Sequence, residues 1–429
     1  MNNSKLKESN IKWLGKIPDN WKTIKFNALY DLRNEKVSDK DFPPLSVTKM
    51  GIVPQLSNAA KTNNGDNRKL VEIGDFAINS RSDRRGSCGI SKYEGSVSLI
   101  NTVLKPINRE MNPRYYGWLF KTVEFADEFY KWGHGIVDDL WTTNWQDMKN
   151  ITLVCPSKTE QNKIADFLDK KVLQIDDISK KIQQEITDLE AYRKSVITKT
   201  ITKGLNPNVP MKDSGIEWIG KIPTDWSVIR LKYLGSAGNG LTYSPQNMTD
   251  ESGTLILRSS NIQHGEIVNA DNVYVNSSVS KSLILKKDDL LICSRNGSKD
   301  LIGKNALINK EFIGSSFGAF MCVFRSKYNQ YIYYVLNSNI FKFYVGSFLT
   351  STINQLTKHN LYNLAFPFPQ KENERKQIIA FLKEKCENIN HLITHKKDQL
   401  KLLNQYKQSI IYEYVTGKKQ VPTEEGAKE

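Results

Sequence analysis

The stretch LKESNIKWLGKIPDNW at residues 6–21 returns as MKDSGIEWIGKIPTDW at residues 211–226, an offset of 205 positions. Nine of these sixteen positions are identical, among them both tryptophans, the glycine and the proline. A match of this length at one constant offset indicates an internal repeat. The chain is therefore expected to fold as two copies of one structural plan.

Further along, the two copies match at an offset of 214, so the second copy has gained nine residues. Residues 74–81 (GDFAINSR) correspond to 288–295 (DDLLICSR), and residues 160–168 (EQNKIADFL) correspond to 374–382 (ERKQIIAFL). Beyond them, Leu189, Tyr192, Ser195 and Ile197 correspond to Leu403, Tyr406, Ser409 and Ile411. The repeat therefore spans both halves of the chain.

The first part of each copy has the composition of a compact α+β domain. It is rich in glycine, asparagine, serine and aromatic residues, with short β-like runs such as 76–78, 97–100 and 290–292. Helical patterns are also present, at 113–130 in the first copy and at 330–345 in the second. Short strands mixed with single helices predict an α+β fold.

The last part of each copy predicts one long helix. From Glu160 to about Lys203 the chain has no glycine or proline, and an apolar residue recurs every seven positions. This repeat is typical of a coiled-coil seam, and such a helix would be roughly 65 Å long. Gly204 and Gly417 follow the two stretches, as expected where helices end. The predicted seam consists of Leu168, Ile175, Ile182, Leu189, Val196, Leu382, Ile389, Leu403 and Ile410, with Lys396 as an interruption.

The predicted fold class is α+β, with two similar α+β domains joined by two long helices. Duplicated helices with similar seams are expected to pack antiparallel about a pseudo-twofold axis. The predicted boundaries are 1–155 and 206–369 for the globular domains, and 156–205 and 370–429 for the helical spacers.

The charge of the chain points to a polyanionic partner. The formal net charge is +15 and the pI is near 9.3, and lysine and arginine neutralise phosphates with release of counterions. Five scattered cysteines form no CxxC pair, and residues 1–10 lack the apolar core of a signal peptide. No apolar run is long enough to span a bilayer, so a cytoplasmic protein is expected.

Motifs for catalysis, cofactors and metals are missing from the sequence. We find no Walker A loop and no GxGxxG after a strand. Residues 112–115 (NPRY) resemble the Asn-Pro-Pro-Tyr motif of adenine methyltransferases, but Arg114 replaces the second proline and no methyl-donor loop accompanies it. His391 and His395 have helical metal-ligand spacing without a third ligand, so we interpret them as polar helix positions. We expect no catalytic site, no metal and no cofactor on this chain.

The sequence instead has polar loops suited to reading DNA. Arginine can contact guanine through two hydrogen bonds and asparagine can do the same with adenine, while serine bonds to base edges or phosphates. For any single residue an ordinary polar turn is an equal alternative, but two arginine-bearing loops at equivalent places favour recognition. The candidates in the first copy are Lys49, Asn79, Arg81, Ser82, Arg84, Arg85 and Ser87. Those in the second copy are Asn239, Thr242, Tyr243, Arg258, Ser260, Asn261, Ser294, Arg295, Asn296 and Lys299.

These motifs together resemble the specificity subunit of type I restriction–modification enzymes. The resemblance rests on the repeated Trp-(Leu/Ile)-Gly-Lys-Ile-Pro-x-x-Trp opening, the strand followed by Ser-Arg, and the lead into a long helix that ends near Thr-Lys-Gly or Thr-Gly-Lys. It covers both halves of the chain. One small departure is Glu374-Arg375, where the first copy has Glu160-Gln161.

The resemblance implies that each globular domain reads one half of a split, asymmetric DNA target. It implies that the paired helices set the gap between the halves and bind two DNA adenine methyltransferase subunits, with restriction and translocase subunits joining them. S-adenosylmethionine, ATP and magnesium would belong to those partners. We expect Val172, Ile178 and Ile186, which lie outside the seven-residue stripe, to face partner helices.

Three alternatives remain at this point. One is a fused methyltransferase–nuclease, which the missing donor and nuclease motifs disfavour. Another is a coiled-coil adaptor without a DNA role, which would leave the two arginine-bearing loops unexplained. The third is a specificity subunit of a related DNA-defence system with different effectors.

Overall fold

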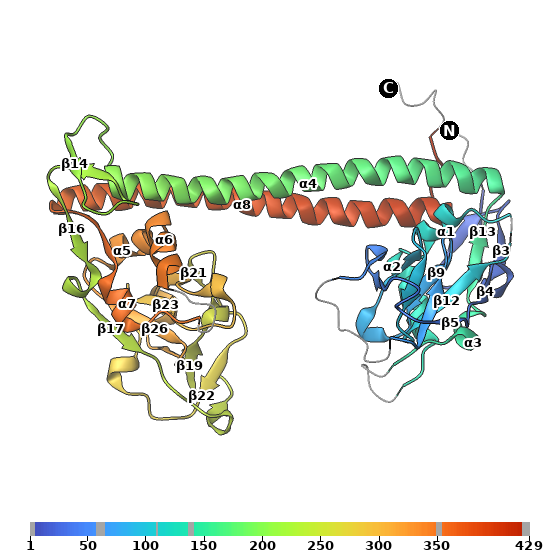
Figure 1. Cartoon of the computed structure of the whole chain (residues 1–429), viewed down its shortest axis with the longest axis horizontal. Helices are drawn as coiled ribbons and strands as arrows, with labels where there is room; N and C mark the ends of the chain where they lie inside the picture. Colours follow the sequence, from blue (N-terminus) through green and yellow to red (C-terminus); the bar gives the residue numbers. More distant parts are fainter. Residues whose placement is uncertain (1–4, 57–64, 109, 136–140, 349–353, 423–429) are drawn as a thin grey trace. The chain divides into compact units, whose positions relative to one another are not determined.

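A computed structural model of the chain describes residues 5–56, 65–108, 110–135, 141–348 and 354–422 (Figure 1). The contacts divide the chain into two compact units. Unit 1 comprises residues 1–183 and 398–429, and unit 2 comprises residues 184–397. Each unit thus combines one globular part with portions of both long helices.

The globular part of unit 1 is built on a four-stranded antiparallel sheet in the order β10-β9-β12-β4. A three-stranded sheet, β11-β8-β5, and the hairpins β1-β2 and β6-β7 lie around it, while β3 pairs with β13. The strands are β1 (Leu6–Glu8), β2 (Lys16–Pro18), β3 (Lys22–Lys25), β4 (Tyr30–Leu32), β5 (Lys36–Val37), β6 (Leu45–Thr48), β7 (Gly51–Pro54), β8 (Arg68–Val71), β9 (Phe76–Asn79), β10 (Cys88–Ile90), β11 (Gly95–Val97), β12 (Asn101–Pro106) and β13 (Thr152–Cys155). The helices are α1 (Pro113–Leu119), α2 (Val123–Lys131) and α3 (Trp145–Met148).

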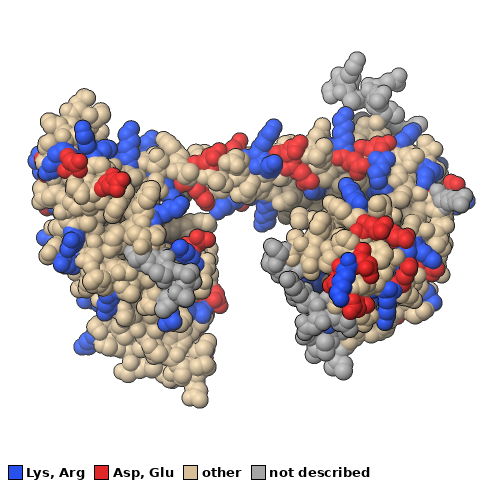
Figure 2. Space-filling model, viewed as in Figure 1, with Lys and Arg blue, Asp and Glu red and all other residues tan. Residues whose placement is uncertain are grey.

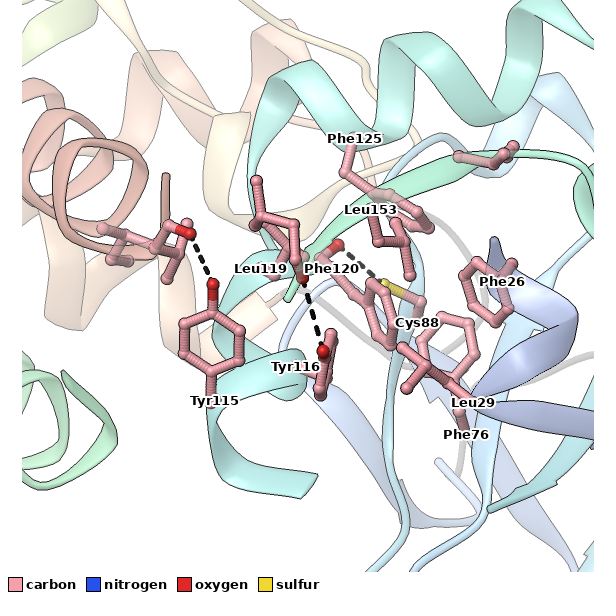
Figure 3. Packing of buried hydrophobic residues seen from close by; sticks show 14 of the residues in the cluster. Phe26, Leu29, Phe76, Cys88, Tyr115, Tyr116, Leu119, Phe120, Phe125 and Leu153 are labelled. Atoms are coloured by element: carbon pink, nitrogen blue, oxygen red, sulfur yellow. Dashed lines mark hydrogen bonds between the residues drawn. The ribbon is translucent and has the colours of Figure 1, made fainter. Parts of the chain in front are cut away.

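An aromatic cluster forms the core of unit 1 (Figure 3). The rings of Phe26 and Phe120 stack with centroids 5.2 Å apart, and Phe76 lies 4.5 Å from Phe120. Each fully buried phenylalanine contributes about 1.5–3 kcal/mol through removal of apolar surface from water. At the edge of this core, the Tyr115 hydroxyl donates to the Val415 carbonyl oxygen at 2.7 Å. The core therefore extends to the end of the second long helix.

Unit 2 repeats this plan with additional strands. Its central sheet has the order β17-β26-β23-β24, and a second sheet has the order β18-β22-β19-β25 with β19 and β25 parallel. The strands are β14 (Met211–Asp213), β15 (Lys221–Pro223), β16 (Trp226–Arg230), β17 (Ser236–Asn239), β18 (Met248–Thr249), β19 (Thr254–Leu257), β20 (Ile262–Gln263), β21 (Glu266–Ile267), β22 (Val273–Val275), β23 (Leu290–Cys293), β24 (Asn305–Leu307), β25 (Ser316–Phe317), β26 (Met321–Arg325) and β27 (Ala365–Pro369). The helices are α5 (Asn329–Leu336), α6 (Asn339–Phe348) and α7 (Lys358–Asn363).

The structure confirms the predicted duplication and the α+β fold class. Hairpin β14-β15 repeats β1-β2, the pair β16-β27 repeats β3-β13, and β23 repeats the central strand β9. The two long helices are α4 (Lys158–Lys203) and α8 (Glu372–Val415). Among the described residues, no helix is both long enough and apolar enough to cross a membrane.

Helices α4 and α8 pack antiparallel within each unit. In unit 1 the rings of Phe167 and Tyr414 lie 4.5 Å apart, and the Lys407 ammonium pairs with Asp176. In unit 2 the Lys396 ammonium lies 2.7 Å from Glu185. Lys396, predicted as an interruption, therefore occupies a seam position and satisfies its charge across the seam.

The predicted seam residues lie on the buried side of the two helices, in a row that recurs every seven positions. Leu168, Ile175, Leu382, Ile389 and Ile410 are buried, and Ile182, Leu189, Val196 and Leu403 are half-buried. A second row completes the alternation of three and four residues that a coiled coil requires. This row includes Val172 and Ile186, which are 4% and 3% exposed.

The expectation that Val172 and Ile186 face partner helices is therefore wrong, because both belong to the second row of the seam. A single stripe with a period of seven identifies only one of the two apolar positions in each heptad. Ile178 is the exposed member of the three residues.

An aromatic–carboxylate clasp joins each globular part to both helices. The Trp21 indole donates to Glu160 Oε1 at 3.0 Å, and the Trp226 indole donates to Glu374 Oε1 at the same distance. The glycine after the opposite helix packs on the same indole. A Cβ on Gly417 would lie 2.9 Å from the Trp21 ring, and one on Gly204 would lie 3.3 Å from Trp226.

The two clasp glycines also have φ near +74°, where a side chain is strained. In unit 1 the helix start is capped as well, because Ser157 Oγ donates to Glu160 Oε2 at 2.8 Å while Glu160 N donates back to Ser157 Oγ. Each clasp thus connects the repeated tryptophan, the start of one helix and the end of the other.

We predict that Glu160→Ala lowers the free energy of unfolding at pH 7 by about 1 kcal/mol, since a partly exposed charged hydrogen bond is lost. Burial opposes ionisation of Glu160, but hydrogen bonds from Trp21 and Ser157 outweigh it and lower its pKa. A carboxylate whose pKa is lower in the folded state than in the unfolded state stabilises the fold at pH values above its unfolded-state pKa. This stabilisation is lost as the pH falls through the folded-state pKa. Chemical denaturation should therefore show that the difference in free energy of unfolding between the wild type and Glu160→Ala becomes smaller below about pH 4.5.

The control for this prediction is Glu384→Ala, which removes an exposed glutamate on α8. It should change the free energy of unfolding by less than about 0.5 kcal/mol at every pH. A pH-independent loss in Glu160→Ala would contradict the role assigned to the ionised clasp.

Candidate nucleic-acid interface

The two arginine-bearing loops leave equivalent strands and are held by equivalent backbone contacts. In unit 1, the loop after β9 is held where Thr143 N donates to the Ser80 carbonyl oxygen at 3.0 Å. In unit 2, Leu356 N donates to the Ser294 carbonyl oxygen at 2.8 Å. The next residues, Arg81 and Arg295, then bridge to Thr142 and Gln355, respectively. The duplication therefore places one arginine at the same point of each unit.

In unit 1 the charged candidates lie on the surface. Lys49 is exposed in the β6-β7 turn, and Arg81 is exposed at the start of its loop. Arg84 lies 3.4 Å from Asp83. Arg85 forms an ion pair with Asp127 at 2.5 Å, and its guanidinium lies 5.7 Å from the Tyr130 ring centroid. The side chain of Ser82 lies outside the described residues.

Asn79 and Ser87 are corrected to loop-shaping residues, because both are buried. Asn79 Oδ1 accepts from Arg81 N at 3.0 Å, and the backbone N–H of Asn79 donates to the Ser87 carbonyl oxygen at 2.9 Å. These bonds close the loop at its base. Burial keeps both side chains away from a base edge at the surface of the loop.

In unit 2 most candidates gather around one hollow of about 1040 Å³. Polar and aromatic side chains from several loops line it, and no single segment of sequence contains them all. The predicted residues in the lining are Thr242, Tyr243, Arg258, Ser260, Arg295 and Asn296. Asn239 and Lys299 are exposed outside this lining. A hollow with π faces, amides and cations has the chemistry of a nucleic-acid contact surface.

The lining residues that sequence reasoning missed include Asp271, Phe320 and Asn354. Asp271 holds Arg258, whose Nη2 lies 2.7 Å from its carboxylate. Phe320 enters from the turn before β26, and Asn354 from the segment before α7. Phe320 corresponds in the structure to Ile100 of unit 1, because Ser294 N donates to the Phe320 carbonyl oxygen as Ser80 N donates to that of Ile100.

Asn261 and Ser294 are also corrected to structural roles. Asn261 is fully buried, its Nδ2 donates to the Ala270 carbonyl oxygen at 2.8 Å, and its Oδ1 accepts from Arg258 N at 2.8 Å. Ser294 is buried, and its hydroxyl donates to the Phe320 carbonyl oxygen at 2.9 Å. Both residues shape the loops that carry the exposed candidates.

The NPRY segment has a structural function. Asn112 Oδ1 accepts from Arg114 N and caps α1, while its Nδ2 donates to Asn162 Oδ1 on α4 at 2.7 Å. The backbone N–H of Asn112 donates to Gln161 Oε1. This asparagine therefore joins α1 to the first turn of α4.

Charge is distributed over both units. Figure 2 shows lysine and arginine spread over the visible face, with acidic side chains interspersed. His391 and His395 are exposed on α8, and within the described part of the chain no three histidine, cysteine or acidic side chains form a metal-binding group. The loops around the arginines thus offer hydrogen bonding and positive charge.

Known proteins with similar sequences have a common description. A family model described as the type I restriction modification DNA specificity domain matches residues 18–188 and 223–402. The specificity subunit of the type I restriction enzyme MjaVIII from Methanocaldococcus jannaschii is 25% identical over 338 residues, covering 76% of this chain and 74% of that protein. The EcoKI specificity subunit from Escherichia coli K12 is 25% identical over 211 residues, covering 46% of this chain and 44% of that protein.

A solved structure shows the same fold. A chain from a study of complex assembly and conformational transition of the type I R-M system superposes with a TM-score of 0.68. It is 13% identical, and the match covers 93% of this chain and 98% of that one.

We predict that Asn261→Ala lowers the free energy of unfolding by about 1–3 kcal/mol, because buried backbone groups lose their partner. Asn239→Ala, at an exposed candidate position, should change it by less than about 0.5 kcal/mol. Chemical denaturation of the full chain measures both. An Asn261→Ala chain of normal stability would contradict the structural role assigned to Asn261.

Proposed function

Since the chain belongs to the type I restriction–modification DNA specificity family, we propose that each globular part reads one half of a split, asymmetric target in double-stranded DNA. The observation that carries this proposal is the duplication of an exposed arginine on an equally held loop, Arg81 in one unit and Arg295 in the other. Two loops that are held by similar backbone contacts but carry different side chains around the arginine suit two different half-sites. Phosphate contacts would supply affinity that falls with salt, and base-edge contacts would supply specificity.

The function of the chain in this proposal is binding rather than catalysis. Two DNA adenine methyltransferase subunits and the restriction and translocase subunits would carry the chemistry, in the bacterial cytoplasm. S-adenosylmethionine, ATP and magnesium would bind to those partners. The alternative is a specificity subunit of a related DNA-defence system, whose effectors would differ while the DNA reading stays the same.

Two exposed apolar pairs on the helices support the binding of two partner subunits. Ile178 and Tyr192 on α4 each lie three residues after a seam position, and Leu392 and Tyr406 on α8 do the same. All four are between 47% and 56% exposed. The Asp176–Lys407 ion pair brings Ile178 and Tyr406 to one stretch of unit 1.

The second pair lies in unit 2. Arg193 donates to Asn390 there, which brings Tyr192 and Leu392 to one stretch of the helix pair. Each residue of one pair corresponds to a residue of the other at the repeat offset of 214. Exposed apolar pairs related by a repeat are suited to binding two copies of one partner.

We predict that Ile178→Lys combined with Tyr406→Lys reduces the bound methyltransferase from two copies to one, because charge is placed in an apolar contact. Tyr192→Lys combined with Leu392→Lys should have the same effect through the other pair. Native mass spectrometry of the co-expressed complex counts the subunits. Leu173→Lys, at an exposed leucine in another heptad position, is the matched control and should retain two copies.

We predict that Arg81→Ala weakens recognition of one half-site only, by about 1–3 kcal/mol if a base contact is lost. Titration of the assembled complex with duplexes altered in one half at a time measures this effect. Arg230→Ala removes an exposed arginine outside the two loops and serves as the control. An equal loss for every duplex would identify Arg81 as a phosphate contact instead.

The direct test of the function is co-expression of the chain with its methyltransferase partner in a methylation-free host. Sequencing of adenine methylation across the genome should reveal a single gapped motif with two different halves. An assembled, active complex that methylates no such motif would overturn the proposal.

A further inference from the structure

One exposed arginine–aromatic pair stands at the mouth of the hollow in unit 2. The guanidinium of Arg295 lies 5.5 Å from the ring centroid of Phe320. Phe320 is 59% exposed and Arg295 is exposed as well. Together the two side chains offer a ligand the N–H donors of a guanidinium and the face of an aromatic ring.

The backbone holds this pair in place. The Phe320 carbonyl oxygen accepts from Ser294 N and Arg295 N, each at 3.0 Å. The buried Ser294 hydroxyl donates to the same oxygen at 2.9 Å. Three donors on one acceptor connect the loop after β23 to the turn before β26. The two side chains therefore leave a shared, rigid support, which lowers the entropy lost on binding.

The guanidinium of Arg295 differs from those of Arg258 and Arg325 in its ion pairs. Arg258 nearby is paired with Asp271, and Arg325 with Asp289. Among the described residues, by contrast, no carboxylate lies within 4.0 Å of the Arg295 guanidinium. Stacking on an aromatic ring uses the face of a guanidinium and leaves its N–H groups free for two parallel bonds.

We propose that Arg295 and Phe320 together read a guanine beside a thymine in the half-site bound by unit 2. This inference rests on the proposed DNA reading. The Arg295 N–H groups donate to guanine O6 and N7, and the Phe320 ring contacts the thymine C5-methyl group. Neighbouring bases on a strand are about 3.4 Å apart, so a ring 5.5 Å from the guanidinium reaches the adjacent base.

Unit 1 offers a different neighbour at the equivalent place. Its arginine is Arg81, and the residue whose carbonyl oxygen accepts from the preceding serine is Ile100. Ile100 is exposed but has no π face on which a guanidinium can stack. An arginine–aromatic pair at this equivalent place therefore distinguishes unit 2 from unit 1, which fits half-sites of different sequence.

The test uses the assembled complex with its methyltransferase subunits and the motif found by methylation sequencing. Deoxyuridine in place of the thymine removes only the methyl group. Binding by the wild-type complex should weaken about fourfold, as for loss of one buried carbon. In the Phe320→Ala complex, deoxyuridine should not change the binding affinity. In the Phe320→Leu complex, a second variant, it should weaken binding by less than in the wild type. The test of the guanine contact replaces guanine with 7-deazaguanine, which lacks N7. This change should weaken DNA binding by the wild-type complex about tenfold and should not change DNA binding by the Arg295→Ala complex.

Two controls accompany these measurements. Deoxyuridine in the other half-site should have the same effect on the wild-type and Phe320→Ala complexes. Phe343→Ala removes another exposed phenylalanine, on α6, and should behave as wild type.

The outcomes separate this inference from the proposed function. A gapped motif whose unit 2 half contains no guanine beside a thymine overturns the inference alone. Equal deoxyuridine losses in the wild-type and Phe320→Ala complexes do the same. An assembled, active complex without any gapped motif overturns both.

Discussion

The hydrogen bond from an indole to a glutamate in the first turn of a long helix connects three distant segments in each unit. Trp21 comes from the globular part, Glu160 begins α4, and Gly417 follows the end of α8. The indole bonds to the carboxylate with its edge and packs against the glycine with its ring. Because the same arrangement recurs with Trp226, one local solution orients both globular parts on the helices. The positions of the two arginine-bearing loops follow from it.

The seam between the helices combines apolar packing with charges at defined places. Lys396 and Lys407 stand at positions where an apolar side chain would be usual, and each meets an acidic residue of α4. An ion pair within a seam is costly unless both members are aligned, so it disfavours other registers of the two helices. The ion pairs therefore help to fix one register of α4 against α8 within each unit.

Patterns with a period were predicted well from the sequence, and contacts that depend on the tertiary fold were not. The repeat and both long helices follow from spacing, and the α+β class follows from composition and short β-like and helical runs. Asn261 and Asn79 were misassigned because a polar side chain that closes a loop has the same residue type as one that reads a base. Phe320 was missed because 25 positions separate it in sequence from Arg295, and the pairing of β23 with β26 brings them together. For the duplicated arginines the internal repeat added a second reason to that of residue type.

Unit 1 consists of two segments that are far apart in sequence, and this affects how the chain folds during synthesis on the ribosome. Its core includes Ile410, Tyr414 and Val415, and the Tyr412 hydroxyl donates to the Trp13 carbonyl oxygen across 399 positions of sequence. Unit 2, by contrast, is continuous from residue 184 to residue 397. Translation thus delivers the complete second unit while the first still lacks part of its core. Residues near the start of the chain, such as Trp13, therefore reach their contacts with α8 only after α8 has been made.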